Sequence, residues 1–450
     1  MLKVIARKFS SMAALMEKDS YSLKKKLIKR TAGSFGLKIG SNGLGFILSI
    51  VFARYLGTAG LGTYSYAMTW ANLSSIPATL GIDQLIVREM AVYHSKSQWR
   101  LMGGLLGWSN LVVFSFSLIF TVVATALIYR WENNLDADVV LAVVLAMLTV
   151  PIASVRNLRL GAMRGLQHIV LGQIPDSLLG PAIVTILTII SYLLFPQSFN
   201  VYWVLVIKIL AIIITFFVGG LWLWRSLPTE VKQVKPEYLG KQWLIAALPF
   251  MFLGTMQLIN SRIDIIMLGG IEGVEAVGIY TIVVGITQLT IIIHQAANSV
   301  LGPTIATLYS ENKLQQLQQV IRKSVLIVFS ASLSIGVVMM GLGKYLLLIF
   351  GSEFFPGRTA MNILILGQIF HAFTGPVGLV LNMTGHQNYT AMSTGASAVL
   401  NIALNALFIP RWGINGAAAA TTISVFVINI INLVIMQKMV KISLYSFSKI

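Results

Sequence analysis

Charged side chains interrupt several of the long apolar segments of this sequence. Arg54, Lys208 and Arg262 are cationic, and Asp176 and Asp264 are anionic. If these segments lie in a bilayer, each such charge costs free energy and is a candidate for binding or proton transfer. Basic groups there can bind anionic ligands, and the carboxylates can act as counter-ions or titrating groups.

Arg262 and Asp264 lie two residues apart in NSRIDIIMLGG. On a helix this spacing separates two side chains by roughly 200°. One can therefore face a cavity while the other bonds to a neighbouring helix. Aligning the Leu-Gly pairs that follow Arg54 and Asp264 sets Arg54 one turn beyond Arg262, which predicts two guanidinium groups at similar depth. The alternative is that Arg54 extends to the outer interface.

Lys208 lies within VYWVLVIKILAIII, with no other charge inside a helical turn. Asp176 is its candidate partner, and a lipid-facing position is the alternative. The charged residues Asp83, Arg88, Arg156, Arg159 and Arg164 lie near the expected cytoplasmic ends of apolar segments. We assign them topological or rim roles, because basic residues collect on that side of membrane proteins.

Two stripes of polar residues follow Tyr64 and Tyr280 at helical spacing. Their members are Ser65, Asn72 and Thr79 in one segment and Thr281, Gln288 and Gln295 in the other. Within each stripe the spacing of seven keeps the residues on one face, with a drift of about 20° per heptad. Each member of the first stripe has its counterpart in the second at the same offset of 216. Their matched positions favour a shared hydrophilic cavity, and hydrogen bonding between packed helices is the alternative.

Short motifs recur at nearly the same offset and indicate an internal repeat. YLGTAGLGTY (55–64) and LGGIEGVEAVGIY (268–280) both end in Gly-x-Tyr at the offset of 216, and Gly165 and Gly385 form a second echo at 220. The repeat predicts two six-helix halves with the same topology, 33–225 and 241–437. Chance similarity between Gly-rich segments is the alternative.

Composition excludes an ordinary soluble fold. Of 450 residues, 56% are hydrophobic and 11% charged, and mean hydropathy is +0.81, whereas soluble domains carry about 25% charged residues. We predict an all-α polytopic membrane protein with twelve spans, at roughly 33–53, 62–82, 104–129, 138–155, 170–194, 201–224, 242–268, 276–300, 322–349, 360–383, 389–409 and 413–437. The distribution of Lys and Arg puts both termini in the cytoplasm. The expected cytoplasmic segments are a basic amphipathic tail (1–32), a linker (226–240) and a C-terminal tail (438–450).

Several function classes are disfavoured. The net charge of +18 is explained by positive charges in cytoplasmic loops, so we expect no nucleic acid partner. The chain has no cysteine, and it lacks the G-x-x-x-x-G-K-[ST], H-E-x-x-H and G-x-S-x-G motifs. We therefore expect no metal, no cofactor and no enzymatic activity, and a function located among the helices.

Three stretches resemble a known family: FARYLGTAGLGTYSYAMTWANLSSIPATLGIDQLIVREMA (52–91), RLGAMRGLQ (159–167) and IPRWGINGAAAATTIS (409–424). They are similar to the polysaccharide flippases of the multidrug/oligosaccharidyl-lipid/polysaccharide (MOP) exporter superfamily, with the O-antigen-type flippases as the nearest branch. The resemblance implies a V-shaped pair of six-helix bundles working by alternating access, with helices 1, 2, 7 and 8 lining the cavity. Such relatives move polyprenyl-pyrophosphate-linked oligosaccharides to the outer leaflet, several of them using an ion gradient.

The resemblance also implies roles for residues. Arg54, Arg262 and Lys208 would meet the pyrophosphate, the two polar stripes would meet the sugars, and Asp264 and Asp176 would act as counter-ions or couple transport to protons or sodium. It implies a bacterial inner membrane location and association with a polysaccharide polymerase complex. The alternatives are a multidrug cation antiporter, which would need buried carboxylates, a lipid II flippase, which commonly has further C-terminal helices, and a membrane glycan polymerase or ligase, which usually has a large external loop.

Overall fold

The computed structural model describes residues 2–131 and 136–442, with side chains from residue 36 onward except at 129, 131, 253, 296 and 300. Residues 132–135, and 443–450 of the expected C-terminal tail, lie outside the described residues. All secondary structure in the described part is helical. The elements are α1 Leu2–Ala78, α2 Ile82–Ser95, α3 Trp99–Trp131, α4 Ala137–Met147, α5 Thr149–Gly165, α6 Ile169–Ile174, η1 Pro175–Leu179, α7 Gly180–Leu194, α8 Val201–Ser226, α9 Thr229–Gln233, α10 Gly240–Glu272, α11 Val274–Ser310, α12 Leu314–Gly341, α13 Gly343–Leu348, η2 Ser352–Gly357, α14 Arg358–Thr374, α15 Val377–Met383 and α16 Gln387–Met439.

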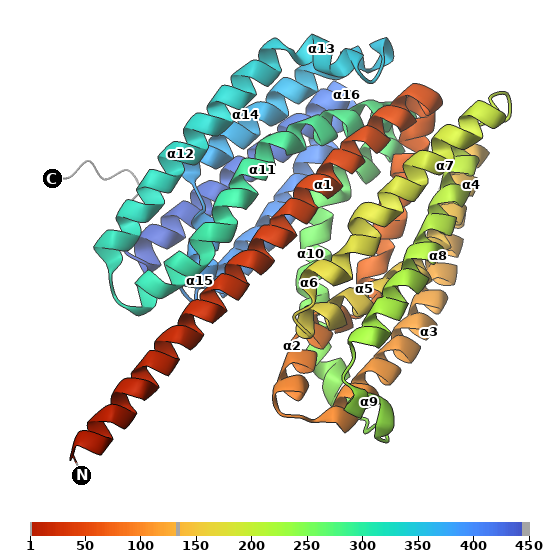
Figure 1. The fold of residues 1–450 in the computed structure, drawn as a ribbon. Coiled ribbons are helices and arrows are strands. Elements are labelled where there is room, and N and C mark those ends of the chain that lie inside the picture. The colour runs from red at the N-terminus through yellow and green to blue at the C-terminus, as the bar shows by residue number, and fades with distance from the viewer. Residues whose placement is uncertain (1, 132–135, 443–450) are drawn as a thin grey trace, which may run out of the picture.

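Nine helical segments in the described part of the chain are long and apolar enough to cross a membrane, and the bent pair η2–α14 and α15 adds a tenth. Two of the nine segments, in α1 and α16, are longer than one span requires. Each is divided by a non-helical glycine, Gly57 in α1 and Gly413 in α16. Both glycines have positive φ, which residues with a side chain rarely adopt. Figure 1 shows the chain reversing direction near the top of α1.

The repeat around offset 216 is present in the backbone. Gly57 has φ 68° and ψ −172°, and its counterpart at this offset, Gly273, has φ 88° and ψ 176°. The second echo is out of register, because Gly165 is helical and ends α5. The positive-φ residue that corresponds to Gly385 (φ 83°) is Gln167 (φ 63°), so the true offset there is 218. A motif match that aligns glycines alone misses this shift.

The helices gather on two sides in Figure 1, with α2–α8 on one side and α11–α16 on the other. The first part of α1 runs along α11, and α10 lies between the two groups. One end of α10 packs against α2 and α3: Trp243 Nε1 donates to Tyr93 Oη at 2.9 Å, and the Trp243 ring lies 5.4 Å from that of Trp108. The rest of α10 packs against α1, α11 and α16.

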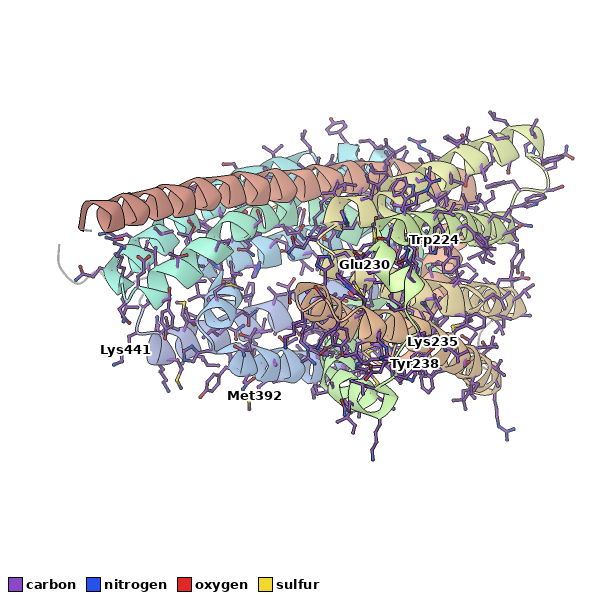
Figure 2. The ribbon with its side chains drawn as sticks, turned by 60° about the horizontal axis from the view of Figure 1, so that its bottom comes forward. Trp224, Glu230, Lys235, Tyr238, Met392 and Lys441 are labelled. Atoms are coloured by element: carbon purple, nitrogen blue, oxygen red, sulfur yellow. The ribbon has the colours of Figure 1, made fainter. Side chains whose placement is uncertain are left out.

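The linker between α8 and α10 is packed rather than extended. Glu237 N donates to Arg100 O at 3.0 Å, and Lys232 Nζ lies 4.1 Å above the Trp224 ring. Gly104 of α3 allows this approach, because a Cβ there would meet Glu237 O at 1.8 Å. Figure 2 shows Trp224, Glu230, Lys235 and Tyr238 together on this side of the molecule, away from Met392 and Lys441.

Candidate functional site

A polar pocket of about 330 Å³ lies where α1, α5, α8, α10 and α11 meet. Five helices from distant parts of the sequence supply its walls. We call it the cationic pocket. Its polar lining residues are Tyr64, Ser65, Thr69, Asn72, Thr149, Arg156, Lys208, Arg262 and Thr281.

Three cations from three helices line this pocket: Arg156 of α5, Lys208 of α8 and Arg262 of α10. No carboxylate is among its lining residues. Arg262 is exposed and makes no hydrogen bond or ion pair within the part of the chain that the structure describes. Its five N–H groups are therefore available to a ligand. Arginine matches the oxygens of a phosphate group with two parallel hydrogen bonds, so the pocket is suited to an anion.

The polar stripes divide between sites. Ser65, Asn72 and Thr281 line the cationic pocket, and Thr281 Oγ1 is buried there with no hydrogen-bond partner among the described residues. Gln288 instead lines a second pocket of about 250 Å³ between α1 and α11. Thr79 is buried and donates to Ile76 O at 2.8 Å and to Asp83 Oδ1 at 3.1 Å, and Gln295 is half-buried and lines neither pocket. One continuous polar face is thus not formed.

Arg54 lies outside the cationic pocket. Its Nε donates to Ile349 O and its Nη2 to Leu348 O, both at 2.8 Å. These carbonyls are at the C-terminal end of α13, where a positive charge is favourable. The expectation of similar depth for Arg54 and Arg262 is wrong: Arg54 lies three residues before Gly57, and Arg262 lies eleven residues before Gly273. The structurally equivalent glycines are Gly57 and Gly273, whereas the Leu-Gly alignment paired Gly57 with Gly269.

Asp264 faces away from Arg262, as their spacing predicts. Its Oδ2 accepts a hydrogen bond from Tyr280 Oη at 2.8 Å, and its Oδ1 accepts from Ile265 N at 2.9 Å. Asp264 and Tyr280 are both buried. This carboxylate therefore links α10 to α11, and it is not the counter-ion of Arg262 in this structure.

Asp176 pairs with arginines rather than with Lys208. Its Oδ2 accepts from Arg159 Nη2, and its Oδ1 lies 3.9 Å from Arg156 Nε. Arg159 also donates from Nη1 to Thr215 O at 2.8 Å. From the sequence we expected both arginines at the cytoplasmic rim, because they lie at the end of an apolar run. The structure places both on α5 facing Asp176, and their spacing of three, which puts them on one helical face, was the signal available.

The comparisons with known proteins agree with this architecture. Residues 27–309 match the family described as "Polysaccharide biosynthesis protein". The chain belongs to this family. Residues 249–407 also match the family MatE, so the resemblance to the MOP superfamily is confirmed.

Two curated relatives concern surface glycans. A Haloferax volcanii protein named "Probable low-salt glycan biosynthesis flippase Agl15" is 31% identical over 176 residues, which cover 38% of this chain and 36% of the relative. The Staphylococcus aureus "Capsular polysaccharide biosynthesis protein CapF" is 23% identical over 245 residues, covering 53% of this chain and 61% of the relative. The matches thus span less than two thirds of either relative.

Solved structures share the fold over most of the chain. An inward-facing multidrug resistance MATE family transporter of the MOP superfamily superposes with a TM-score of 0.73 at 16% identity, covering 91% of this chain and 96% of that chain. The lipid II flippase MurJ in an inward closed conformation gives 0.72 at 11% identity, covering 91% and 87%. The expected polytopic helical fold is therefore that of MOP superfamily transporters.

Proposed function

We propose that this protein is a flippase that moves a polyprenyl-pyrophosphate-linked oligosaccharide from the cytoplasmic to the outer leaflet. The observation that carries the proposal is the meeting of Arg156, Lys208 and Arg262 in one pocket without a lining carboxylate. A pyrophosphate carries the complementary charge. The hydroxyl and amide groups of Ser65, Thr69 and Asn72, also in this pocket, supply partners for sugar hydroxyls.

The origin of the three cations supports alternating access. Arg156 and Lys208 belong to helices before the linker, and Arg262 belongs to α10, which follows it. A bound anion would therefore be held by both halves of the repeat, 33–225 and 241–437. Separating α1 at Gly57 and α16 at Gly413, and joining the bent pair, gives twelve spans and supports two six-helix bundles. The even number puts both termini on one side, which the distribution of Lys and Arg assigns to the cytoplasm.

We propose the following transport cycle. The headgroup enters the cationic pocket when it is open to the cytoplasm, while the lipid tail remains in the bilayer. Closure of the inner ends of the bundles then exposes the pocket to the other side. An ion gradient, carried by protons or sodium, assists the return. We place the protein in a bacterial inner membrane, where it would supply a polysaccharide polymerase.

A multidrug cation antiporter is the second candidate, since residues 249–407 match MatE and the solved multidrug transporter shares the fold. The charge of the pocket favours the flippase, because three lining cations repel a cationic drug. A lipid II flippase shares the fold and also carries a pyrophosphate, so the glycan is what distinguishes it.

The test measures a labelled polyprenyl-pyrophosphate oligosaccharide on the far leaflet of reconstituted vesicles, with and without a pH gradient. We expect protein-dependent appearance that Arg262→Gln abolishes. The matched control is Arg358→Gln, at an exposed arginine that does not line the pocket. Movement of a cationic dye, with no movement of glycans that include lipid II, would replace the flippase with the antiporter.

A further inference from the structure

A second charged group lies directly behind the cationic pocket. Asp176 faces Arg156 and Arg159 of α5, and its side chain is 12% exposed. Arg159 is 5% exposed, whereas Arg156 is 26% exposed and lines the pocket. One carboxylate is thus shared between a deeply buried arginine and an arginine that reaches the candidate binding site.

The two arginines hold Asp176 differently. Arg159 makes a direct ion pair with Oδ2, and its other nitrogen, Nη1, is fixed by Thr215 O. It also packs on Gly219, where a Cβ would collide with the guanidinium group. Arg159 therefore has no freedom to leave Asp176.

The contact between Arg156 and Asp176 is incomplete. Arg156 Nε and Asp176 Oδ1 are 3.9 Å apart, beyond hydrogen-bond distance. Both atoms are buried, and neither has a hydrogen-bond partner among the described residues. Leaving a buried polar atom unsatisfied is costly, so Arg156 gains by bonding an additional acceptor.

The backbone explains why Asp176 reaches this position. Pro175–Leu179 forms a single π-helical turn between α6 and α7. Such a turn inserts an extra residue into a helix and is frequent at functional sites. It lies against α1 and α8, and from there Asp176 reaches Arg156 and Arg159 of α5.

We propose that Asp176 is an internal counter-ion that competes with the ligand for Arg156. When a pyrophosphate group enters the pocket, Arg156 turns from Asp176 to the phosphate oxygens, and Arg159 retains the carboxylate. When the ligand leaves, Asp176 recovers Arg156. Asp176 is therefore a positioning residue that weakens ligand binding enough to permit release. This inference rests on the proposed function, because it requires an anionic ligand in the cationic pocket.

The test compares dissociation constants of the purified full chain in detergent for farnesyl pyrophosphate, measured by calorimetry. Asp176→Asn removes the competing charge, and we expect binding about tenfold tighter, which corresponds to about 1.4 kcal/mol. Asp176→Glu extends the carboxylate toward Arg156, and we expect weaker binding. The gain in Asp176→Asn should disappear when Arg156→Gln is added.

Opposite shifts in the two Asp176 variants separate this role from a structural one. A purely structural carboxylate would lose binding in both variants, and that result would overturn the inference. If Asp176→Asn does not fold, wild-type affinity in Asp176→Glu would overturn it as well.

Asp138→Asn is the matched control, since Asp138 bonds Tyr202 outside the pocket. Inorganic pyrophosphate as a second probe separates recognition of the headgroup from recognition of the lipid. If wild type binds neither probe, the proposed function itself fails.

Discussion

Gly62 and Gly278 make reciprocal contacts across the interface between α1 and α11. A Cβ on Gly62 would lie 1.6 Å from Val274 O, and a Cβ on Gly278 would lie 2.0 Å from Thr58 O. Gly62 and Gly278 are related by the repeat offset of 216, and so are Thr58 and Val274. The two repeats therefore meet through the same surface on each side, as in a two-fold symmetric interface.

Gly62→Ala tests this contact. Alanine is ordinarily a better helix former than glycine, yet here its methyl group collides with backbone that has no rotamer to adopt. We expect a loss of about 1 to 3 kcal/mol of stability, as for overpacking, seen as a lower thermal unfolding temperature in detergent. Gly278→Ala should have a similar effect, because the contact is reciprocal.

Gly285→Ala in α11 is the matched control, since a Cβ there would meet no described atom within 4 Å outside the adjoining backbone of α11. It should leave the unfolding temperature unchanged or raise it slightly. Equal unfolding temperatures for Gly62→Ala and Gly285→Ala would show that α1 and α11 do not approach as closely as the structure indicates.

Arg54→Gln distinguishes a structural arginine from a ligand-binding one. The substitution removes two hydrogen bonds to the carbonyl groups of Leu348 and Ile349, and we expect a loss of about 1 kcal/mol of stability. The dissociation constant for farnesyl pyrophosphate should stay within twofold of wild type. Arg262→Gln should give the reverse pattern, with weaker binding and unchanged stability. A large loss of binding in Arg54→Gln would restore the role first expected for Arg54.

A site residue could be predicted when a local property of the sequence marks it, and could not when its role depends on contacts between distant segments. Lys208, Arg262 and Asn72 were identifiable because each is a polar residue within an apolar run, a local property. Their meeting in one pocket was only partly predictable, because Lys208 comes from α8, which is not one of the four helices expected to line the cavity. Arg156 was assigned to a rim because a hydropathy window ends at the first arginine, whereas its contact with Asp176 depends on how α5 packs against the turn at Pro175–Leu179.

The stripes divide between sites for a geometric reason. A spacing of seven keeps residues on nearly one face of a helix, but Thr281 and Gln288 lie about 10 Å apart along α11. The helices that pack beside α11 differ between these two positions, so the two residues line different pockets. Asp264 is a different case: its partner Tyr280 lies 16 residues away, across the turn at Gly273, and pairing them requires the orientation of both helices.

Asp264→Asn tests whether this carboxylate couples transport to an ion gradient. An asparagine Oδ1 can still accept the hydrogen bond from Tyr280 Oη, so the link between α10 and α11 is retained. We expect transport, and its dependence on a pH gradient, to match wild type in reconstituted vesicles. Tyr280→Phe should instead lower stability by about 1 to 3 kcal/mol, because it removes the hydrogen-bond donor to Oδ2 of the buried carboxylate. Loss of the gradient dependence in Asp264→Asn would identify Asp264 as a coupling group.

Lys208→Gln tests whether the cationic pocket acts as one site. Lys208 shares the pocket with Arg156 and Arg262 but comes from α8, and it makes no hydrogen bond or ion pair within the described part of the chain. Removing its charge should weaken binding of farnesyl pyrophosphate about tenfold, or about 1.4 kcal/mol. Because glutamine keeps the first two methylene groups of the lysine side chain, packing in α8 should change little.

The control for Lys208 is Lys323→Gln, at an exposed position on α12. Combining Lys208→Gln with Arg262→Gln should lower the affinity by less than the product of the single effects, because both groups contact one anion and residues that share a partner are not independent. Fully multiplicative losses of affinity would mean that the two cations act on separate ligands. The cationic pocket would then not be a single binding site.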